Sequence, residues 1–179
     1  MAETKPENAG RRRALKAIVA LGSAAWAAAL LVPGISYLLH PLKRRRGDAG
    51  GWWPVADVEA VPAENAMPVA VPVVGEVVDA WTRSPQQRLG TVWLRKKGEG
   101  QVLALQAECP HLGCSVQLDA SRNRFQCPCH ESFFDLEGRC TGGPSPRGMD
   151  PLAARVRDGK VEVNFKRFRT QTRDRESIG

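Results

Sequence analysis

One long run of apolar side chains stands out near the start of the chain. It extends from Ala17 to Leu39, 23 residues without a charged side chain. A helix of that length, rising about 1.5 Å per residue, can cross a hydrocarbon core of roughly 30 Å. Cleaved signal peptides have apolar regions of only about 7–15 residues. The small residues at 24–29 leave cleavage open, and a buried soluble helix is a further alternative. The pattern favours a transmembrane anchor over residues 17–39.

Beyond the anchor the pattern changes to short Val-rich runs broken by Pro and Gly. Residues 40–51 are polar and Gly-rich, which predicts a flexible tether. Strands are then predicted at Val69–Val74, Thr91–Arg95, Val102–Gln106 and Lys160–Phe165. No soluble helix is predicted. The simplest interpretation is one all-β domain over residues 52–165, followed by a loose polar tail over residues 166–179.

The last predicted strand has the clearest pattern. Val161, Val163 and Phe165 alternate with polar residues, as they do in a strand with one buried face. Asp158-Gly159, directly before this strand, is a strong hairpin-turn signal.

The distribution of charge excludes one class of partner. The chain carries a formal net charge of +7, of which +6 belongs to residues 1–50 and only +1 to the remainder. A nucleic-acid-binding fold would carry its basic residues on the folded part, so no nucleic-acid partner is expected. The 42% hydrophobic content argues against a disordered chain.

The basic residues flank the anchor on both sides, so the positive-inside rule does not orient it. The segment from Gly10 to Lys16, Gly-Arg-Arg-Arg-Ala-Leu-Lys, resembles a twin-arginine export signal, with Ala14 where Phe is commoner. That route carries folded, cofactor-loaded domains out of the cytoplasm. The resemblance implies a cytoplasmic N-terminus over residues 1–16 and a folded domain on the extracytoplasmic, periplasmic side of a bacterial cytoplasmic membrane.

The candidate chemistry lies in two short boxes. Six of the chain's eight Cys and His residues occur between positions 109 and 130, in the boxes Cys109-Pro110-His111-Leu112-Gly113-Cys114 and Cys127-Pro128-Cys129-His130-Glu131-Ser132. Two Cys and two His can bind a structural zinc ion, or a 2Fe–2S centre with the thiolates on one iron and the imidazoles on the other. Both options leave one cysteine over in each box, and in an oxidising compartment the two would pair as a disulfide.

Together the boxes resemble the Rieske iron–sulfur signature, Cys-x-His-x-Gly-Cys followed by Cys-x-x-His. The resemblance implies a Rieske-type antiparallel β domain with a small cluster-binding part at about residues 107–147. It implies a Rieske-type 2Fe–2S cluster with Cys109 and Cys127 on the inner iron and His111 and His130 on the outer iron. It also implies a Cys114–Cys129 disulfide, a feature of the respiratory branch of the family.

The resemblance extends to residues around the boxes, with two departures. Gly143-Pro144-Ser145-Pro146 resembles the proline loop that covers the cluster, and Ser132 matches a serine that donates a hydrogen bond to sulfide. Glu131 stands where Gly is usual, which predicts strain if φ is positive there. Phe134 stands where high-potential members have Tyr. Losing one donor to sulfur lowers the potential, which favours menaquinol over ubiquinol.

The implied function is that of a Rieske subunit in a cytochrome bc-type quinol–cytochrome c oxidoreductase. His111 and His130 would accept a proton from quinol while the cluster accepts an electron, and Leu112 would form an exposed apolar tip that seals the site. The expected partners are a cytochrome b subunit, a c-type cytochrome acceptor, quinol and the membrane. The alternatives are a Rieske electron carrier of an arsenite-type molybdenum oxidase and a structural zinc-binding membrane protein. Cys140 is left without a partner and is expected to be a buried, inert thiol.

Overall fold

The computed structural model describes residues 8–43, 51–78, 82–98 and 100–178. The chain divides into two compact units, Met1–Arg45 and Arg46–Gly179, and each is described by itself. The predicted tether falls mainly on residues 44–50, which lie outside the described residues, so its flexibility stays a prediction.

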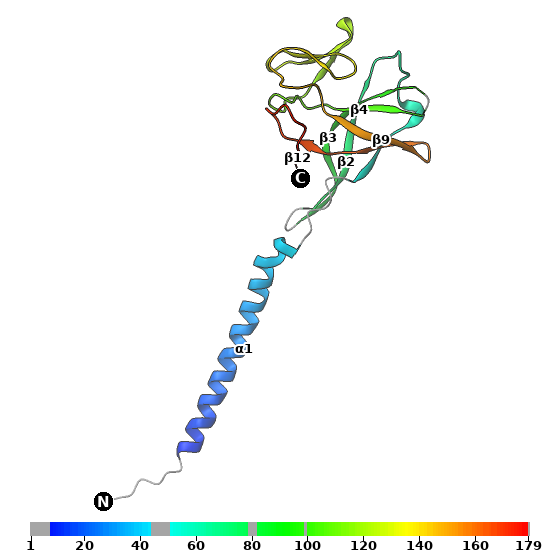
Figure 1. Cartoon of the computed structure of the whole chain (residues 1–179). Coiled ribbons are helices and arrows are strands. Elements are labelled where there is room, and N and C mark those ends of the chain that lie inside the picture. Colours follow the sequence, from blue (N-terminus) through cyan, green and yellow to red (C-terminus); the bar gives the residue numbers. More distant parts are fainter. Residues whose placement is uncertain (1–7, 44–50, 79–81, 99, 179) are drawn as a thin grey trace, which may run out of the picture. The chain divides into compact units, whose positions relative to one another are not determined.

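The described part of the first unit, residues 8–43, is one helix, α1 (Asn8–Lys43), drawn in blue to cyan in Figure 1. The most apolar 18-residue window of its segment Gly10–His40 has a mean hydropathy of 2.0, and none of that window is buried in protein. The helix extends beyond the predicted span of residues 17–39 at both ends and runs through Pro33. Large apolar side chains along it, such as Trp26 and Leu38, are exposed. A helix of this length that is apolar and uncovered by protein fits a lipid environment.

The second unit is built on a six-stranded antiparallel sheet in the order β1-β10-β9-β4-β3-β2. The two edge strands contact each other: Trp53 of β1 packs where Gly75 of β2 has no side chain, and a Cβ there would lie 2.6 Å from the indole ring. The sheet therefore curls so that its edges meet. The strands are β1 (Trp52–Asp57), β2 (Val69–Val78), β3 (Arg83–Lys96), β4 (Val102–Gln106), β9 (Pro151–Arg157) and β10 (Lys160–Asn164), with a 3-10 turn, η1 (Val58–Ala60), after β1.

The core of this sheet is almost entirely aliphatic. Val161 and Val163 of β10 are buried, as their alternation predicted. The hairpin turn before β10 is also confirmed, since both of its residues have positive φ, 50° at Asp158 and 73° at Gly159. The buried members of the core are Val61, Val73, Val92, Leu94, Ala104, Leu152, Val161, Val163 and Phe165.

Between β4 and β9 the chain forms a second, four-stranded antiparallel sheet in the order β5-β6-β7-β8. Its strands are β5 (Gln117–Asp119), β6 (Arg124–Cys127), β7 (Ser132–Phe134) and β8 (Cys140–Gly142), with a 3-10 turn, η2 (Ala120–Arg122), between β5 and β6. A separate core lies here, formed by Leu105, Cys109, Val116, Phe125, Cys127, Phe134 and Met149. Trp93 of β3 joins the two sheets, because its ring lies 5.2 Å from that of Phe125 and its Nε1 donates to the Val116 carbonyl at 3.2 Å.

The prediction of a loose tail over residues 166–179 is wrong for the part that the structure describes. The short strands β11 (Arg167–Phe168) and β12 (Ser177–Ile178) pair with each other. Phe168 packs against the core of the larger sheet, and the Arg169 amide donates to the Glu176 carbonyl at 2.9 Å. The segment is polar, as its composition indicates, but main-chain hydrogen bonds order it.

Candidate metal centre

The first box is a tight loop between β4 and β5. The Cys109 amide donates to the Cys114 carbonyl and the Gly113 amide donates to the Cys109 carbonyl, both at 2.8 Å. Gly113 has a φ of +79°, a conformation that glycine adopts without strain. The loop therefore turns back on itself within six residues and presents Leu112, 47% exposed, at its tip. The expected exposed apolar tip is confirmed.

The second box is the turn between β6 and β7. Cys127 and Ser132 pair across the two strands, and the Glu131 amide donates to the Cys127 carbonyl at 3.1 Å. Glu131 has a φ of +57°, a conformation that is costly for a residue with a Cβ. The backbone strain predicted for Glu131 is therefore present.

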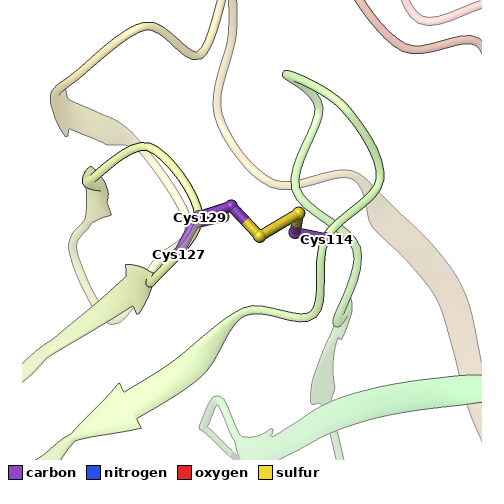
Figure 2. Close-up of side chains that lie close together, drawn as sticks. All are labelled: Cys114, Cys127 and Cys129. Atoms are coloured by element: carbon purple, nitrogen blue, oxygen red, sulfur yellow. A yellow bond between two sulfur atoms is a disulfide. The ribbon is translucent and has the colours of Figure 1, made fainter.

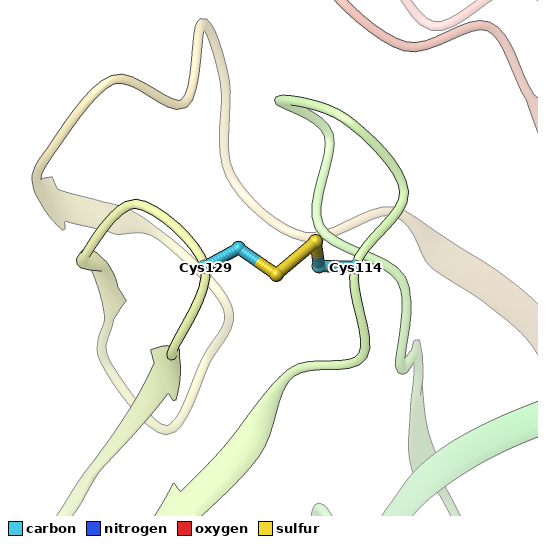
Figure 3. Close-up of a disulfide and its surroundings, with 2 residues drawn as sticks. All are labelled: Cys114 and Cys129. Atoms are coloured by element: carbon cyan, nitrogen blue, oxygen red, sulfur yellow. A yellow bond between two sulfur atoms is a disulfide. The ribbon is translucent and has the colours of Figure 1, made fainter.

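A disulfide ties the two boxes together. Cys114 and Cys129 are bonded, 15 residues apart in sequence, and Figures 2 and 3 show the bond joining the loop of the first box to that of the second. The sulfurs of Cys114, Cys127 and Cys129 all lie within 4.8 Å of one another. Because Cys114 and Cys129 form the disulfide, they are not thiolate ligands, and this group of three is not a metal site by itself. It brings the free Cys127 thiol directly beside the bridge.

The two remaining cysteines of the boxes form a dry side of the site. Cys109 and Cys127 are free and only 1% and 2% exposed. Burial raises the pKa of the Cys109 thiol, and the neighbouring Cys127 thiol raises it further, while the His111 main-chain N–H and the Ser132 hydroxyl oppose the shift. These pKa effects require the two thiols to lie close to each other.

Ser132 lies on the same dry side. It is fully buried, and among the described residues its Oγ has no hydrogen-bond partner of ordinary geometry, although the hydroxyl is near enough to favour the Cys109 thiolate. A buried hydroxyl is costly unless a partner accepts its proton. The position therefore suits a sulfur acceptor.

The two histidines form the solvent side. The rings of His111 and His130 lie 4.9 Å apart in an edge-to-face arrangement. His130 is exposed and His111 is half-buried. The two imidazoles are therefore already together and accessible, although 18 residues separate them in the sequence.

The four expected ligands are arranged as two pairs. A tetrahedral zinc ion, with bonds of about 2.0–2.3 Å, would draw all four donor atoms into one compact group. Among the described residues, the compact group of possible ligands is the cysteine triplet around the disulfide, not the set of Cys109, His111, Cys127 and His130. A thiol pair and a separate imidazole pair match a two-iron centre, in which each pair binds its own iron.

The segment that resembles the proline loop lies against the second box. Gly143 has a φ of +88°, and a Cβ on it would lie 2.3 Å from the Glu131 carbonyl oxygen and 2.5 Å from the Ser132 Cα. Only glycine fits so close to the backbone that follows His130. Cys140, expected to be a buried thiol, is free but only half-buried, and its Sγ contacts the carbonyls of Gly142 at 3.6 Å and Ser145 at 3.8 Å.

One carboxylate lies next to the first box. Partial burial raises the pKa of Glu108, and Arg167 of the C-terminal segment opposes the shift. Gln106 Nε2 donates to the Glu108 Oε2 at 3.0 Å. The charge of Arg167 in the C-terminal segment therefore acts on the residue directly before the first box.

Sequence reasoning missed a second group of residues beside the boxes. Arg147 and Asp150 form a buried ion pair, and the Gln171 amide donates to the Pro110 carbonyl at 2.8 Å. The available signal was weak: an arginine after Ser145-Pro146 and an aspartate three residues later. Several of their partners are main-chain carbonyls, which leave no trace in the side-chain pattern.

Comparisons with known proteins give a consistent result. A model of the Rieske [2Fe-2S] domain matches residues 51–161. The menaquinol:cytochrome c reductase iron-sulfur subunit of Geobacillus thermodenitrificans is 31% identical over 139 residues, covering 75% of this chain and 79% of the relative. The subunit of the same name from Bacillus subtilis is 29% identical over 137 residues, covering 74% and 78%. Among solved structures, the cyanobacterial plasma membrane Rieske protein of Synechocystis is 31% identical, covers 41% of this chain and 76% of its own, and superposes with a TM-score of 0.37.

Proposed function

The chain belongs to the Rieske [2Fe-2S] domain family, and on that premise we propose that it is the iron–sulfur subunit of a quinol–cytochrome c oxidoreductase. Its relatives over most of the chain are named as subunits of such reductases. The observation that carries the proposal is the pair of buried free thiols and the pair of accessible imidazoles on two loops joined by one disulfide. This architecture combines a dry metal-binding side with a proton-accepting side.

We propose Cys109 and Cys127 as the ligands of the inner iron and His111 and His130 as those of the outer iron. The residues fit a Rieske cluster: the thiols are free and buried, the imidazoles are paired, and Ser132 holds a buried hydroxyl in need of an acceptor. When bound, a 2Fe–2S cluster of this kind accepts and releases one electron.

The histidines perform the proton chemistry. An imidazole that binds metal through one ring nitrogen keeps the second nitrogen free to exchange a proton. At His130, which is exposed, and at His111, which is half-buried, that second nitrogen can accept a hydrogen bond from a quinol hydroxyl and then hold its proton. Leu112 presents its apolar side chain to the partner and excludes water from the contact.

The partners follow from this chemistry. Quinol is oxidised in the membrane, so a cytochrome b subunit would bind it against the histidine side, and a c-type cytochrome would accept the electron. We favour menaquinol, because Phe134 has no hydroxyl to donate toward sulfur, and a cluster bound here would have a lower potential for that reason. The names of the Geobacillus and Bacillus relatives also support menaquinol.

The chain is a single-pass membrane subunit, with α1 as its span. We propose that residues 1–16 are cytoplasmic and that the twin-arginine-like segment exports residues 52–165, with the C-terminal segment, already folded. The anchor over residues 17–39 and the tether over residues 40–51 would then hold the domain at the periplasmic surface. Protease added to intact spheroplasts should cleave the domain and spare the N-terminus; protection of the domain would reverse this orientation.

Electron paramagnetic resonance of dithionite-reduced membranes tests the proposed cofactor ligation and function together. A signal with average g below 2, bleached by added quinone, is expected. A colourless protein that contains zinc would contradict the ligand set. Co-purification with a molybdenum enzyme and without a cytochrome b would favour the arsenite-type oxidase instead.

A further inference from the structure

Arg147 closes the loop that begins at Gly143, and its side chain is buried. Arg147 and Asp150 are only 6% and 5% exposed at their side chains. The guanidinium of Arg147 makes a bidentate contact with the carboxylate of Asp150: Nε donates to Oδ1 at 2.9 Å, and Nη2 donates to Oδ2 at 2.7 Å. Ser145 Oγ donates to the Arg147 carbonyl at 2.8 Å. The end of this loop is therefore held at both its main chain and its side chain.

The remaining donors of Arg147 bind the C-terminal segment Arg167–Ile178, which we call the strap. Nη1 donates to the Thr172 carbonyl at 2.5 Å and Nη2 donates to the Arg169 carbonyl at 2.9 Å. In addition, Nε of Arg175 in the strap donates to Asp150 Oδ1 at 3.2 Å. A lysine has a single ammonium group and cannot reproduce this planar set of contacts.

The strap in turn binds the first box. The Gln171 amide donates to the Pro110 carbonyl at 2.8 Å, and Pro110 is the residue between Cys109 and His111. Gln171 has a φ of +63°, so the strap takes an unfavourable backbone conformation at the point of contact. The methyl group of Thr170 lies 3.9 Å from the position of a Cβ on Gly113. The strap thus follows one side of the ligand loop.

The strap has no strand in either of the two larger sheets, because β11 and β12 pair only with each other among the described residues. Figure 1 draws it in red at the C-terminal end of the chain. Phe168 packs on the core, and Arg167 donates to the Leu89 carbonyl at 3.4 Å. The hydrogen bonds of the strap with Pro110, Arg147 and Asp150 join it to the loops around the proposed centre. Its position indicates a role in holding those loops.

We propose that the strap is a positioning element for the proposed metal centre, and that Arg147 and Gln171 are its two attachment points. Arg147 fixes the strap to the loop that covers the second box, and Gln171 fixes it to the peptide between the two ligands of the first box. The strap thereby limits opening of the first box, which the Cys114–Cys129 disulfide restrains only at the far end of the loop. The proposal rests on the assignment of Cys109 and His111 as ligands.

Amide hydrogen exchange of the purified full chain tests the strap without relying on turnover. Gln171→Pro removes the N–H donor and forces φ negative, while its matched control Gln171→Gly keeps the N–H and tolerates positive φ. Arg147→Lys keeps the positive charge but removes the planar guanidinium that makes several hydrogen bonds at once. Its control is Arg157→Lys, at an exposed arginine. We expect at least tenfold faster exchange at Cys109 and Gly113 in Gln171→Pro and Arg147→Lys, and less than twofold change in both controls.

Two results would overturn the proposal. If the amides of the first box exchange at the same rate in Gln171→Pro and Gln171→Gly, the strap does not restrain the first box. Equal acceleration in the first box and in β1 and β10 would show general destabilisation instead of positioning. In the loaded protein, we also expect a broadened electron paramagnetic resonance signal in the two test variants and an unchanged one in the controls. Accelerated exchange with no Rieske signal in any variant, the unmutated chain included, would support the contact between the strap and the first box but overturn the ligand assignment and, with it, the positioning role at a metal centre.

Discussion

The cysteine side and the histidine side of the proposed centre are built from the same two loops but differ in their access to solvent. Cys109, Cys127 and Ser132 belong to a packed core, whereas His111 and His130 face outward to different degrees. Each box supplies one free cysteine to the dry side and one histidine to the solvent side, because its cysteine lies where the chain leaves the core and its histidine lies in the turn. Under the proposed ligand assignment, the dry side tunes the potential and the solvent side exchanges the proton.

Loss of a buried thiol should have the largest effect. Cys127→Ser replaces a thiol with a hydroxyl in a core where no other free thiol except Cys109 is buried among the described residues. We expect iron content to fall more than about tenfold, since even changes to residues outside the ligand set cost about 10–100-fold in metal affinity. Iron and sulfide analysis measures this directly. Retention of full iron by the serine variant would contradict the assignment of Cys127.

Breaking the disulfide should have the next largest effect, on stability first. A crosslink closing a loop of this length contributes about 3 kcal/mol, and the two bridged cysteines are 15 residues apart. We expect Cys114→Ser to lower the free energy of unfolding by about that amount and to release the cluster more readily. Thermal and denaturant unfolding measures the first, and cluster retention during dialysis the second.

Cys140 provides the matched control for the disulfide. It is free and half-buried, so Cys140→Ala should keep the cluster and cost far less stability than Cys114→Ser. Equal cluster loss in Cys140→Ala and Cys114→Ser would contradict a specific role of the disulfide in cluster retention.

The difference between the two sides also shows what could be predicted from sequence. The aliphatic core was predictable, because Val161 and Val163 alternate with polar neighbours over a strand that has one buried face. The approach of the two Cys/His boxes was predictable from their spacing and their family resemblance, and the Cys114–Cys129 disulfide joins them. The smaller sheet was not, since strands of three or four residues, such as β5 and β7, are too short to establish a period.

The strap was missed for a different physical reason. Its attachment uses the carbonyls of Thr172 and Arg169 and the amide of Gln171, and every residue has such groups. Composition predicted a loose tail because the segment has few apolar side chains. The single side chain that orders it most, Arg147, lies about 20 residues upstream and looks like an ordinary surface arginine in the sequence.

Tuning of the dry side should be of intermediate size. Ser132→Ala removes a buried donor and should lower the midpoint potential, while Phe134→Tyr adds a hydroxyl to a fully buried ring and should raise it. A hydrogen bond to a charged group is worth roughly 1.5–3 kcal/mol, which corresponds to about 60–130 mV for one electron if the bond acts only on the reduced state. Redox titration monitored by electron paramagnetic resonance measures both shifts. An unchanged potential in Phe134→Tyr would mean that this ring serves only the core.

The smallest effect should come from Glu131, next to the solvent side. Its φ of +57° costs about 1–2 kcal/mol for a residue with a Cβ, and the greater chain entropy of glycine offsets about 0.5–1 kcal/mol of any gain. Glu131→Gly should therefore stabilise the domain by about 0–1.5 kcal/mol, measured by thermal unfolding. Glu131→Gln is the control, because it removes the charge and keeps the strain. It should leave stability unchanged and raise the midpoint potential slightly at low salt, since a carboxylate beside His130 opposes added negative charge and is screened when exposed. Equal stabilisation by Gln and Gly would show that the charge, and not the backbone conformation, is the unfavourable feature of this position.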